Sequence, residues 1–310
     1  MIRRALLAAL LAAAVSPAQT LRIGVFGLFS PAELTVSPAP GTVLLIDAGG
    51  TRLELADGET MRCAARNLSI ACTAGDETFS ASVVSATPRA PGDFLLAVPG
   101  RIERRFRGTL AIRVRAGALD PVVSVDLETA VASVVAAEAP HGAPFESLAA
   151  QAVVTRSYYA AARGRHTGCD FCDTTHCQFL LQPPPPDAPA SRAANATTGL
   201  VLTWRGRPLA ALFSASCGGR TRALSRPSDG YPYFAVDCPS CPRTRCAYCT
   251  RTDGPWPNRR GAGAGHGLGL CQAGAAAMAA SGANFLSILM HYYPSTTLTL
   301  SSAAESILQY

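Results

Sequence analysis

The sequence of 310 residues contains no lysine, so all permanently positive side chains are arginines. The arginines are dispersed, and the sequence has no basic stripe of the kind that binds nucleic acid. The glycine-rich stretch GHGLGL (265–270) also lacks the lysine and the spacing of a phosphate-binding loop. We therefore expect neither a nucleic acid nor a nucleotide as a partner.

Long hydrophobic runs are also missing, since a spanning helix needs about 20 apolar residues. The apolar residues 5–15 follow Arg3 and Arg4 and precede the small-residue sequence SPA, which predicts a secretory signal peptide over residues 1–18. Its removal lowers the net charge of +6 by two. We expect an exported protein of the periplasm or cell envelope with no membrane span after cleavage, where disulfides can form.

The first 140 residues contain no histidine. Residues 19–120 show short alternating runs such as TVLLID and GTLAIRVRAG between turn residues, a pattern that predicts a β-rich region of six to nine strands. Cys63 and Cys72 flank AARNLSIA, which predicts a hairpin closed by a disulfide. We expect this region to be a scaffold or binding surface and assign any chemistry to the second half.

Residues 121–300 change in character. Helical patterns cover 126–139 and 145–164, and two further helices are expected over 267–282 and 284–293. Residues 199–216 predict a β-hairpin, and the proline-rich residues 182–190 an extended surface segment. The predicted fold class is α+β, with an N-terminal β-rich region, a mixed α/β domain and a tail at 301–310.

Two charged residues stand out on the first two helices. Glu138 lies in the last turn of an apolar helix, where the helix dipole and apolar neighbours disfavour its ionised form. Those conditions suit a proton-donating carboxyl, although a solvated helix-end glutamate is the plainer alternative. Arg156 lies among small and apolar residues and could orient a carboxylate or an anionic substrate group. Alternatively, it extends its charged head to solvent.

The loop HTGCDFCDTTHCQ (166–178) is rich in possible metal ligands. His166, Cys172, His176 and Cys177 could complete the tetrahedral shell of a structural zinc ion. A set made of Cys169, Cys172, Cys177 and one histidine fits the spacing as well. A disulfide between Cys172 and Cys177 is a third possibility in an exported protein.

The remaining cysteines lie further along the chain. CPSCPRTRCAYC (238–249) is compatible with two disulfides or with a second zinc site. Cys217 and Cys271 belong to two glycine-rich turns, and we predict that they pair with each other. His266, in the second turn, could hydrogen-bond a sugar or have no role.

These motifs, in this order, resemble the domain shared by stage II sporulation protein D and the LytB amidase enhancers (the SpoIID/LytB family). The matching stretches span roughly residues 120 to 300 and are VVAAEAP, LAAQAVVTRSYY, CDTTHCQ, ATTGLVLTWRGRPLAALFSASCGGRT, GYPYF, GHGLGLCQAGA and ILMHYYPSTTL. The resemblance implies a SpoIID-type catalytic domain that cleaves peptidoglycan glycan strands, preferably peptide-stripped ones, as a lytic transglycosylase. It implies a catalytic role for Glu138 and for Arg156.

The resemblance also implies a structural Zn²⁺ in the loop, with the ligands His166, Cys172, His176 and Cys177. It aligns Thr221 and Tyr233 with conspicuous family positions, and the predicted substrate-binding set is Thr221, Tyr233, His266 and Gln272. Most glycosidases need two carboxylates, whereas a lytic transglycosylase needs one; near Glu138 only Glu146 and Asp173 could be a second. The enhancer branch of the family implies the alternative function, a non-catalytic glycan-binding module that stimulates a cell-wall amidase.

Overall fold

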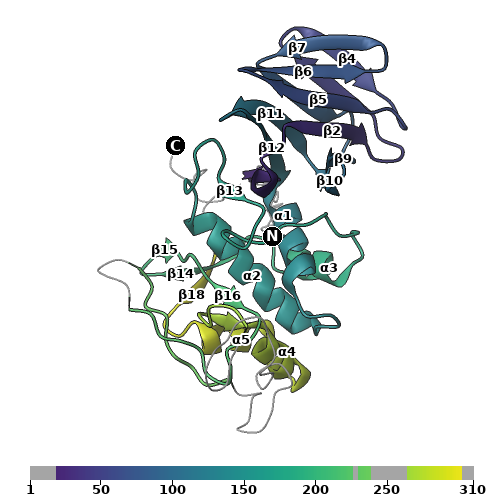
Figure 1. The fold of residues 1–310 in the computed structure, drawn as a ribbon. Helices are drawn as coiled ribbons and strands as arrows, with labels where there is room; N and C mark the ends of the chain where they lie inside the picture. The colour runs from purple at the N-terminus through teal and green to yellow at the C-terminus, as the bar shows by residue number, and fades with distance from the viewer. Residues whose placement is uncertain (1–18, 226–229, 239–263, 302–310) are drawn as a thin grey trace, which may run out of the picture.

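The structure is a computed structural model that describes residues 19–225, 230–238 and 264–301. The predicted signal peptide, residues 302–310 of the tail and the cysteines Cys241, Cys246 and Cys249 lie outside these ranges. The α+β class is confirmed: strands dominate up to residue 126, and five helices follow among the described residues. In Figure 1 the strands of the N-terminal region lie at one end, α4 and α5 at the other, and α2 between them.

Two antiparallel sheets make up the N-terminal region. The first has the order β13-β1-β12-β11-β8-β3-β4 and the second β10-β9-β2-β5-β6-β7, with β13 joining by a parallel pairing to β1. The first sheet comprises β1 (Thr20–Gly24), β3 (Leu44–Ala48), β4 (Thr51–Leu55), β8 (Val83–Pro88), β11 (Thr109–Arg115), β12 (Ala118–Asp126) and β13 (Phe171–Cys172). The second comprises β2 (Glu33–Pro38), β5 (Met61–Arg66), β6 (Ser69–Ala74), β7 (Glu77–Ala81), β9 (Asp93–Val98) and β10 (Ile102–Arg107).

The prediction of six to nine strands was too low, because twelve strands lie between residues 20 and 126. Strands such as β2 and β9 alternate buried residues with mostly partly buried ones, and their buried residues join one core with those of the first sheet. By contrast, β4 and β7 are mostly exposed edge strands and therefore carry little hydrophobic pattern.

Gly108 is the point where the chain passes from the second sheet to the first, between β10 and β11. Its φ is +114°, and a Cβ at this position would lie 2.0 Å from the carbonyl oxygen of Ser124. Only glycine accommodates both the backbone angle and this close approach.

The second half is organised around α2 (Phe145–Ala161). Residues 147–159 of this helix are all buried, as expected for a helix covered on every side. It packs against α1 (Leu127–Glu138), α3 (Pro189–Ala196), α4 (Gln272–Ala280) and α5 (Phe285–Tyr292). Four of these helices were predicted; α3 was not, because its first turn lies in the proline-rich segment.

Short strands complete this half. β14 (Leu200–Trp204) lies between β15 (Arg207–Pro208) and β18 (Thr297–Leu300), and β16 (Phe213–Ser214) pairs in parallel with β17 (Leu270–Cys271). The predicted hairpin is therefore real for β14 and β15, but the chain then leaves it to pair with β17. Gly269, just before β17, has φ +67°, and a Cβ there would lie 2.0 Å from the Leu212 carbonyl oxygen.

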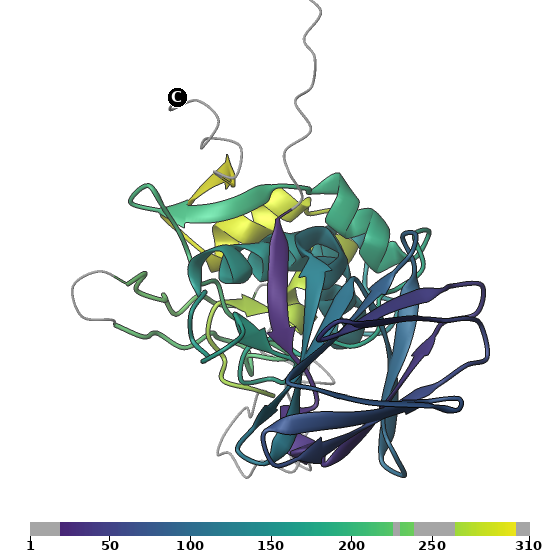
Figure 2. The same ribbon diagram turned by 90° about the horizontal axis from the view of Figure 1, so that it is seen from above.

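The two halves share a sheet, since β12 crosses residue 120 and leads directly into α1. Asp126 ends the strand and caps the helix, accepting hydrogen bonds from the backbone N–H groups of Glu128 and Thr129. In Figure 2 the purple strand β1 runs across the teal helices. Among the described residues, no helix combines the length and the apolar character that a membrane crossing requires.

Candidate functional site

A cavity of about 460 Å³ lies between the end of α1, the cysteine-rich loop and the glycine-rich turns. Its lining includes Glu138, Tyr158 and Arg165, together with residues 175–178, 211–215 and 264–266. The fold therefore brings together the regions 138–178, 211–215 and 264–266, which lie far apart in the sequence.

Glu138 is the last residue of α1 and is partly buried. Its Oε1 accepts a hydrogen bond from the Phe179 backbone N–H at 3.1 Å, and its backbone oxygen accepts one from Gln272 Nε2 at 2.9 Å. Burial raises the pKa of the Glu138 carboxyl, and the Phe179 N–H opposes this rise in pKa only partly. The side chain is therefore suited to hold a proton at a pH where an exposed carboxyl has lost it.

No other carboxylate belongs to the described lining of this cavity. Glu146 accepts a hydrogen bond from the Phe285 backbone N–H at 2.7 Å, at the start of α5. Asp173 is buried, accepts the Phe26 N–H at 3.2 Å and pairs with Arg104 at 2.9 Å. Both carboxylates that could have completed a two-carboxylate site thus have structural partners elsewhere.

The structure brings His166, Cys172, His176 and Cys177 together, with one ligand atom of each within 4.8 Å of the others. His166 Nε2 lies 3.1 Å from Cys177 Sγ, and Cys172 Sγ lies 3.8 Å from His176 Nδ1. Two imidazoles and two thiols are a donor set that zinc prefers, so these residues fit a four-ligand structural zinc site.

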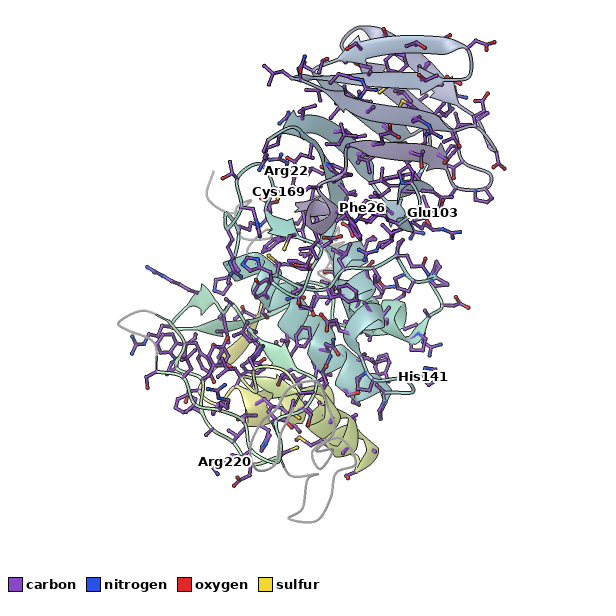
Figure 3. All side chains as sticks on the ribbon, viewed as in Figure 1. Arg22, Phe26, Glu103, His141, Cys169 and Arg220 are labelled. Carbon is purple, nitrogen blue, oxygen red and sulfur yellow. The ribbon has the colours of Figure 1, made fainter. Side chains whose placement is uncertain are left out.

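Cys169 does not join this group. Its Sγ lies against Gly24 of β1, 3.0 Å from where a Cβ of that glycine would be. Next to it, Arg22 bonds residues of the same loop, with its backbone N–H donating to Asp170 at 2.9 Å and its Nη2 to the Gly168 carbonyl oxygen. Figure 3 shows Arg22 and Cys169 side by side at this edge of the first sheet. The ligand set that includes Cys169 is therefore disfavoured.

The structure corrects the expectation for Arg156. Its side chain is fully buried and pairs with Glu128, with Nε to Oε1 at 2.8 Å and Nη2 to Oε2 at 2.5 Å. The remaining donors reach the carbonyl oxygens of Leu200 and Ala194, both at 3.1 Å. Glu128 and Glu138 are ten residues apart on α1, which separates them by about 15 Å along the helix. Arg156 therefore orients a different carboxylate and does not reach the cavity.

The predicted substrate-binding residues lie in different places. His266 lines the cavity, and its Nδ1 accepts the Leu268 N–H at 3.0 Å, so a neutral imidazole carries its proton on Nε2. Gln272 is buried and holds the Glu138 backbone instead of facing the cavity. Thr221 is also buried, accepting the Val236 N–H at 2.8 Å and donating to the Phe234 carbonyl oxygen at 3.1 Å.

Tyr233 lines a second cavity of about 430 Å³, on the other side of the segment that follows β15. Its hydroxyl donates to the Ala210 carbonyl oxygen at 2.6 Å. Trp204, Arg207 and Tyr231 line the same space, which is therefore aromatic and basic.

Arg165 is the cavity residue that sequence reasoning missed. It is exposed, donates a hydrogen bond to the Tyr158 hydroxyl and lines the cavity beside Glu138. Burial raises the pKa of Tyr158 to about 12, so this phenol stays neutral. The sequence could have pointed to Arg165 through its position directly before His166, the first residue of the metal-ligand group.

The predicted disulfide partners are close together in both places. Cys63 and Cys72 are opposite each other in the hairpin β5–β6, with their Sγ atoms 2.7 Å apart. Cys217 and Cys271 also lie together, but Cys238 forms a group of three with them. The two pairings stay predictions, and the third thiol at the second place was not expected.

The comparison with protein families gives a match over residues 115–204 to the family described as "SpoIID: Stage II sporulation protein". Residues 115–204 are similar to the SpoIID family. The match confirms the resemblance read from the motifs and covers β12, α1, α2, the cysteine-rich loop and β14. It therefore includes Glu138 and all four residues of the metal-ligand group. Among curated proteins, no sequence matches the chain. The SpoIID domain indicates a cell-wall-related role.

Proposed function

We propose that the protein is an exported lytic transglycosylase of the periplasm or cell envelope that cleaves peptidoglycan glycan strands, preferring peptide-stripped ones. The observation that carries the proposal is the environment of Glu138, a partly buried carboxyl with a raised pKa in a cavity whose described lining has no second carboxylate. A reaction that uses one carboxyl group first as acid and then as base fits this arrangement, whereas a two-carboxylate hydrolysis does not.

The reaction proceeds in two proton transfers. Protonated Glu138 donates its proton to the glycosidic oxygen between N-acetylmuramic acid and N-acetylglucosamine, and the bond to the muramic anomeric carbon breaks. The Glu138 carboxylate then takes the proton from the muramic C6 hydroxyl as that oxygen attacks the anomeric carbon. A 1,6-anhydro ring closes, N-acetylglucosamine leaves with a free hydroxyl, and Glu138 is protonated again without consumption of water.

One other cavity residue, Arg165, has matching chemistry. Arg165 offers an exposed guanidinium in the same cavity as Glu138, suited to the lactyl carboxylate of muramic acid. This is the role that the sequence suggested for Arg156. His266 helps to shape the cavity wall, because its ring hydrogen-bonds the backbone of both Leu268 and Phe213.

His166, Cys172, His176 and Cys177 would hold a structural Zn²⁺. Four protein ligands leave no position for substrate, so the ion would supply a cross-link within the loop and no chemistry at the sugar. His176 and Cys177 themselves line the cavity, and Phe179, two residues further on, donates to Glu138. The loop thereby positions the proton-donating group.

The test is digestion of purified peptide-stripped glycan strands, with anhydro-muramic ends detected by mass spectrometry. Wild type should release anhydro products, and Glu138→Gln should release none while keeping its fold and its glycan binding. Glu146→Gln is the matched control, because Glu146 is a helix-end glutamate that lies outside the cavity lining. Release of anhydro products by Glu138→Gln would remove this residue from the mechanism.

The second candidate function is a glycan-binding enhancer of a cell-wall amidase. The second cavity favours it, because Trp204, Tyr231 and Arg207 form an aromatic and basic surface suited to sugar rings and acidic groups without a carboxyl to cleave them. On this alternative the purified protein releases nothing from stripped strands but accelerates an amidase, and Glu138→Gln does so equally well.

A further inference from the structure

Cys217, Cys238 and Cys271 form a second cysteine group, with their three Sγ atoms within 4.8 Å of one another. They come from three separate segments: the turn after β16, the extended segment that bonds back to Gly219, and the start of α4. Cys238 and Cys271 are buried, and Cys217 is partly exposed. Backbone hydrogen bonds already hold these segments together, from the Ala273 N–H to the Ala215 carbonyl oxygen at 3.1 Å and from the Cys238 N–H to the Gly219 carbonyl oxygen at 2.9 Å, so the three sulfur atoms are held in fixed positions.

Two backbone N–H groups point at the sulfur of Cys271. Its Sγ accepts the backbone N–H of Cys217 at 3.3 Å and that of Gly274 at 3.4 Å. Cys271 is also the N-cap of α4, where the helix dipole favours negative charge. Hydrogen bonds to sulfur and a helix N-terminus are features that stabilise a metal-bound thiolate.

The sulfur of Cys238 lies against Gly274, where a larger residue would collide with it. Gly274 has no side chain, and a Cβ there would lie 2.3 Å from Cys238 Sγ. The Tyr292 hydroxyl lies 3.6 Å from the same sulfur and can donate to it when the sulfur is ionised. Each buried sulfur of the group thus has a polar hydrogen within reach.

A disulfide can join only two of these three cysteines. A tetrahedral zinc ion with bonds of about 2.3 Å places its sulfur ligands roughly 3.8 Å apart, which three sulfurs within 4.8 Å can meet together. Soft thiolate ligands select zinc over hard cations. We propose that Cys217, Cys238 and Cys271 bind a second zinc ion as three thiolates.

This site would fix the wall of the Glu138 cavity. Ser214 and Ala215 of that wall precede Cys217, and Gln272, which donates to the Glu138 backbone, follows Cys271. The inference does not depend on the proposed cleavage reaction, since metal binding can be measured without a substrate.

The first experiment measures zinc in the purified full-length protein by elemental mass spectrometry. Wild type should contain about two zinc ions per chain, and each of Cys217→Ser, Cys238→Ser and Cys271→Ser about one. Cys172→Ser should also contain about one, through loss of the other site, and the matched control Cys63→Ser should keep both. The proposal is overturned if these three variants keep the zinc content of wild type.

A second measurement uses only the wild type, so that the test does not depend on the folding of the cysteine variants. In the zinc-loaded protein Cys217 should resist alkylation, and a chelator without reductant should make it reactive, as mapped by peptide mass spectrometry. If Cys217 instead becomes reactive only after reduction and is recovered as a cystine with Cys271, the group is a disulfide and the zinc assignment is wrong.

Discussion

Substitution of Arg156 by methionine separates a structural arginine from a catalytic one. The guanidinium is fully buried and makes four hydrogen bonds: two to the Glu128 carboxylate and one each to the carbonyl oxygens of Leu200 and Ala194. Methionine fills a similar volume but provides no donor. The substitution therefore leaves Glu128 and two carbonyl oxygens without these partners.

The size of the effect follows from the burial of the pair. Removing one partner of a buried ion pair costs about 3–5 kcal/mol. Glu128 is 23% exposed and still accepts the Gly199 N–H at 3.3 Å, so partial hydration favours the lower end of that range. For a chain of this size, with an unfolding entropy of about 2.1 cal/mol/K per residue, a loss of about 3 kcal/mol lowers Tm by roughly 5 °C.

Thermal unfolding and glycan digestion, measured on the same preparations, distinguish a structural role of Arg156 from a catalytic one. Arg156→Met should melt at a clearly lower temperature and, well below its Tm, should keep its activity. Arg165→Met is the matched comparison, because Arg165 is exposed and lines the cavity: its Tm should stay close to that of wild type while activity falls. The reasoning is refuted if Arg156→Met melts like wild type but has lost its activity.

Three further predictions follow from the structure. Because burial raises the pKa of Glu138, the folded state binds this proton more tightly than the unfolded state, and the fold loses stability as pH rises above the ordinary carboxyl range. In thermal melts, Glu138→Gln should therefore exceed wild type in Tm at pH 7, with the gap closing below about pH 4; a gap that widens towards acid contradicts this. Removal of zinc by a chelator, or Cys172→Ser, should lower Tm and glycan cleavage, and added zinc should restore only the chelated wild type. Gly269→Ala should cost more unfolding free energy than Gly282→Ala, because both glycines have positive φ but only Gly269 would place a Cβ against a carbonyl oxygen; equal denaturant midpoints would show that the strand pair tolerates the shift.

The elements that sequence predicted best are those with strong local signals. Helices α1, α2, α4 and α5 follow from apolar runs bounded by proline, glycine or a capping residue, and Asn284 caps α5 through the Ser287 N–H as its position suggested. The sequence could not predict which strands pair within a sheet, because the register of β1 with β12 depends on residues about a hundred positions apart. The short pair β16–β17 is likewise held by a long-range contact with no local pattern.

The candidate site divides in the same way. The pattern offered Glu138 as a candidate and the loop as one of several possible ligand sets, since helix position and ligand spacing are local properties, and the family resemblance then selected His166, Cys172, His176 and Cys177. The pattern could not tell which carboxylate Arg156 faces, because Glu128 and Glu138 both lie on the neighbouring helix and differ only in distance along it. It also could not show that Cys238 joins Cys217 and Cys271, a meeting that depends on how the loops fold back over α4 and α5.

Glu138 connects the two cysteine groups. The Glu138 carboxyl accepts a hydrogen bond from Phe179, two residues after Cys177 of the metal-ligand group. The Glu138 backbone oxygen accepts one from Gln272, the residue after Cys271. That backbone oxygen belongs to the last turn of α1, whose carbonyl groups have no partner within the helix. One group therefore fixes the side chain and the other fixes the helix end. Both contacts are needed to hold the Glu138 carboxyl in place, because rotation of the last turn would move it even if its own hydrogen bond were kept.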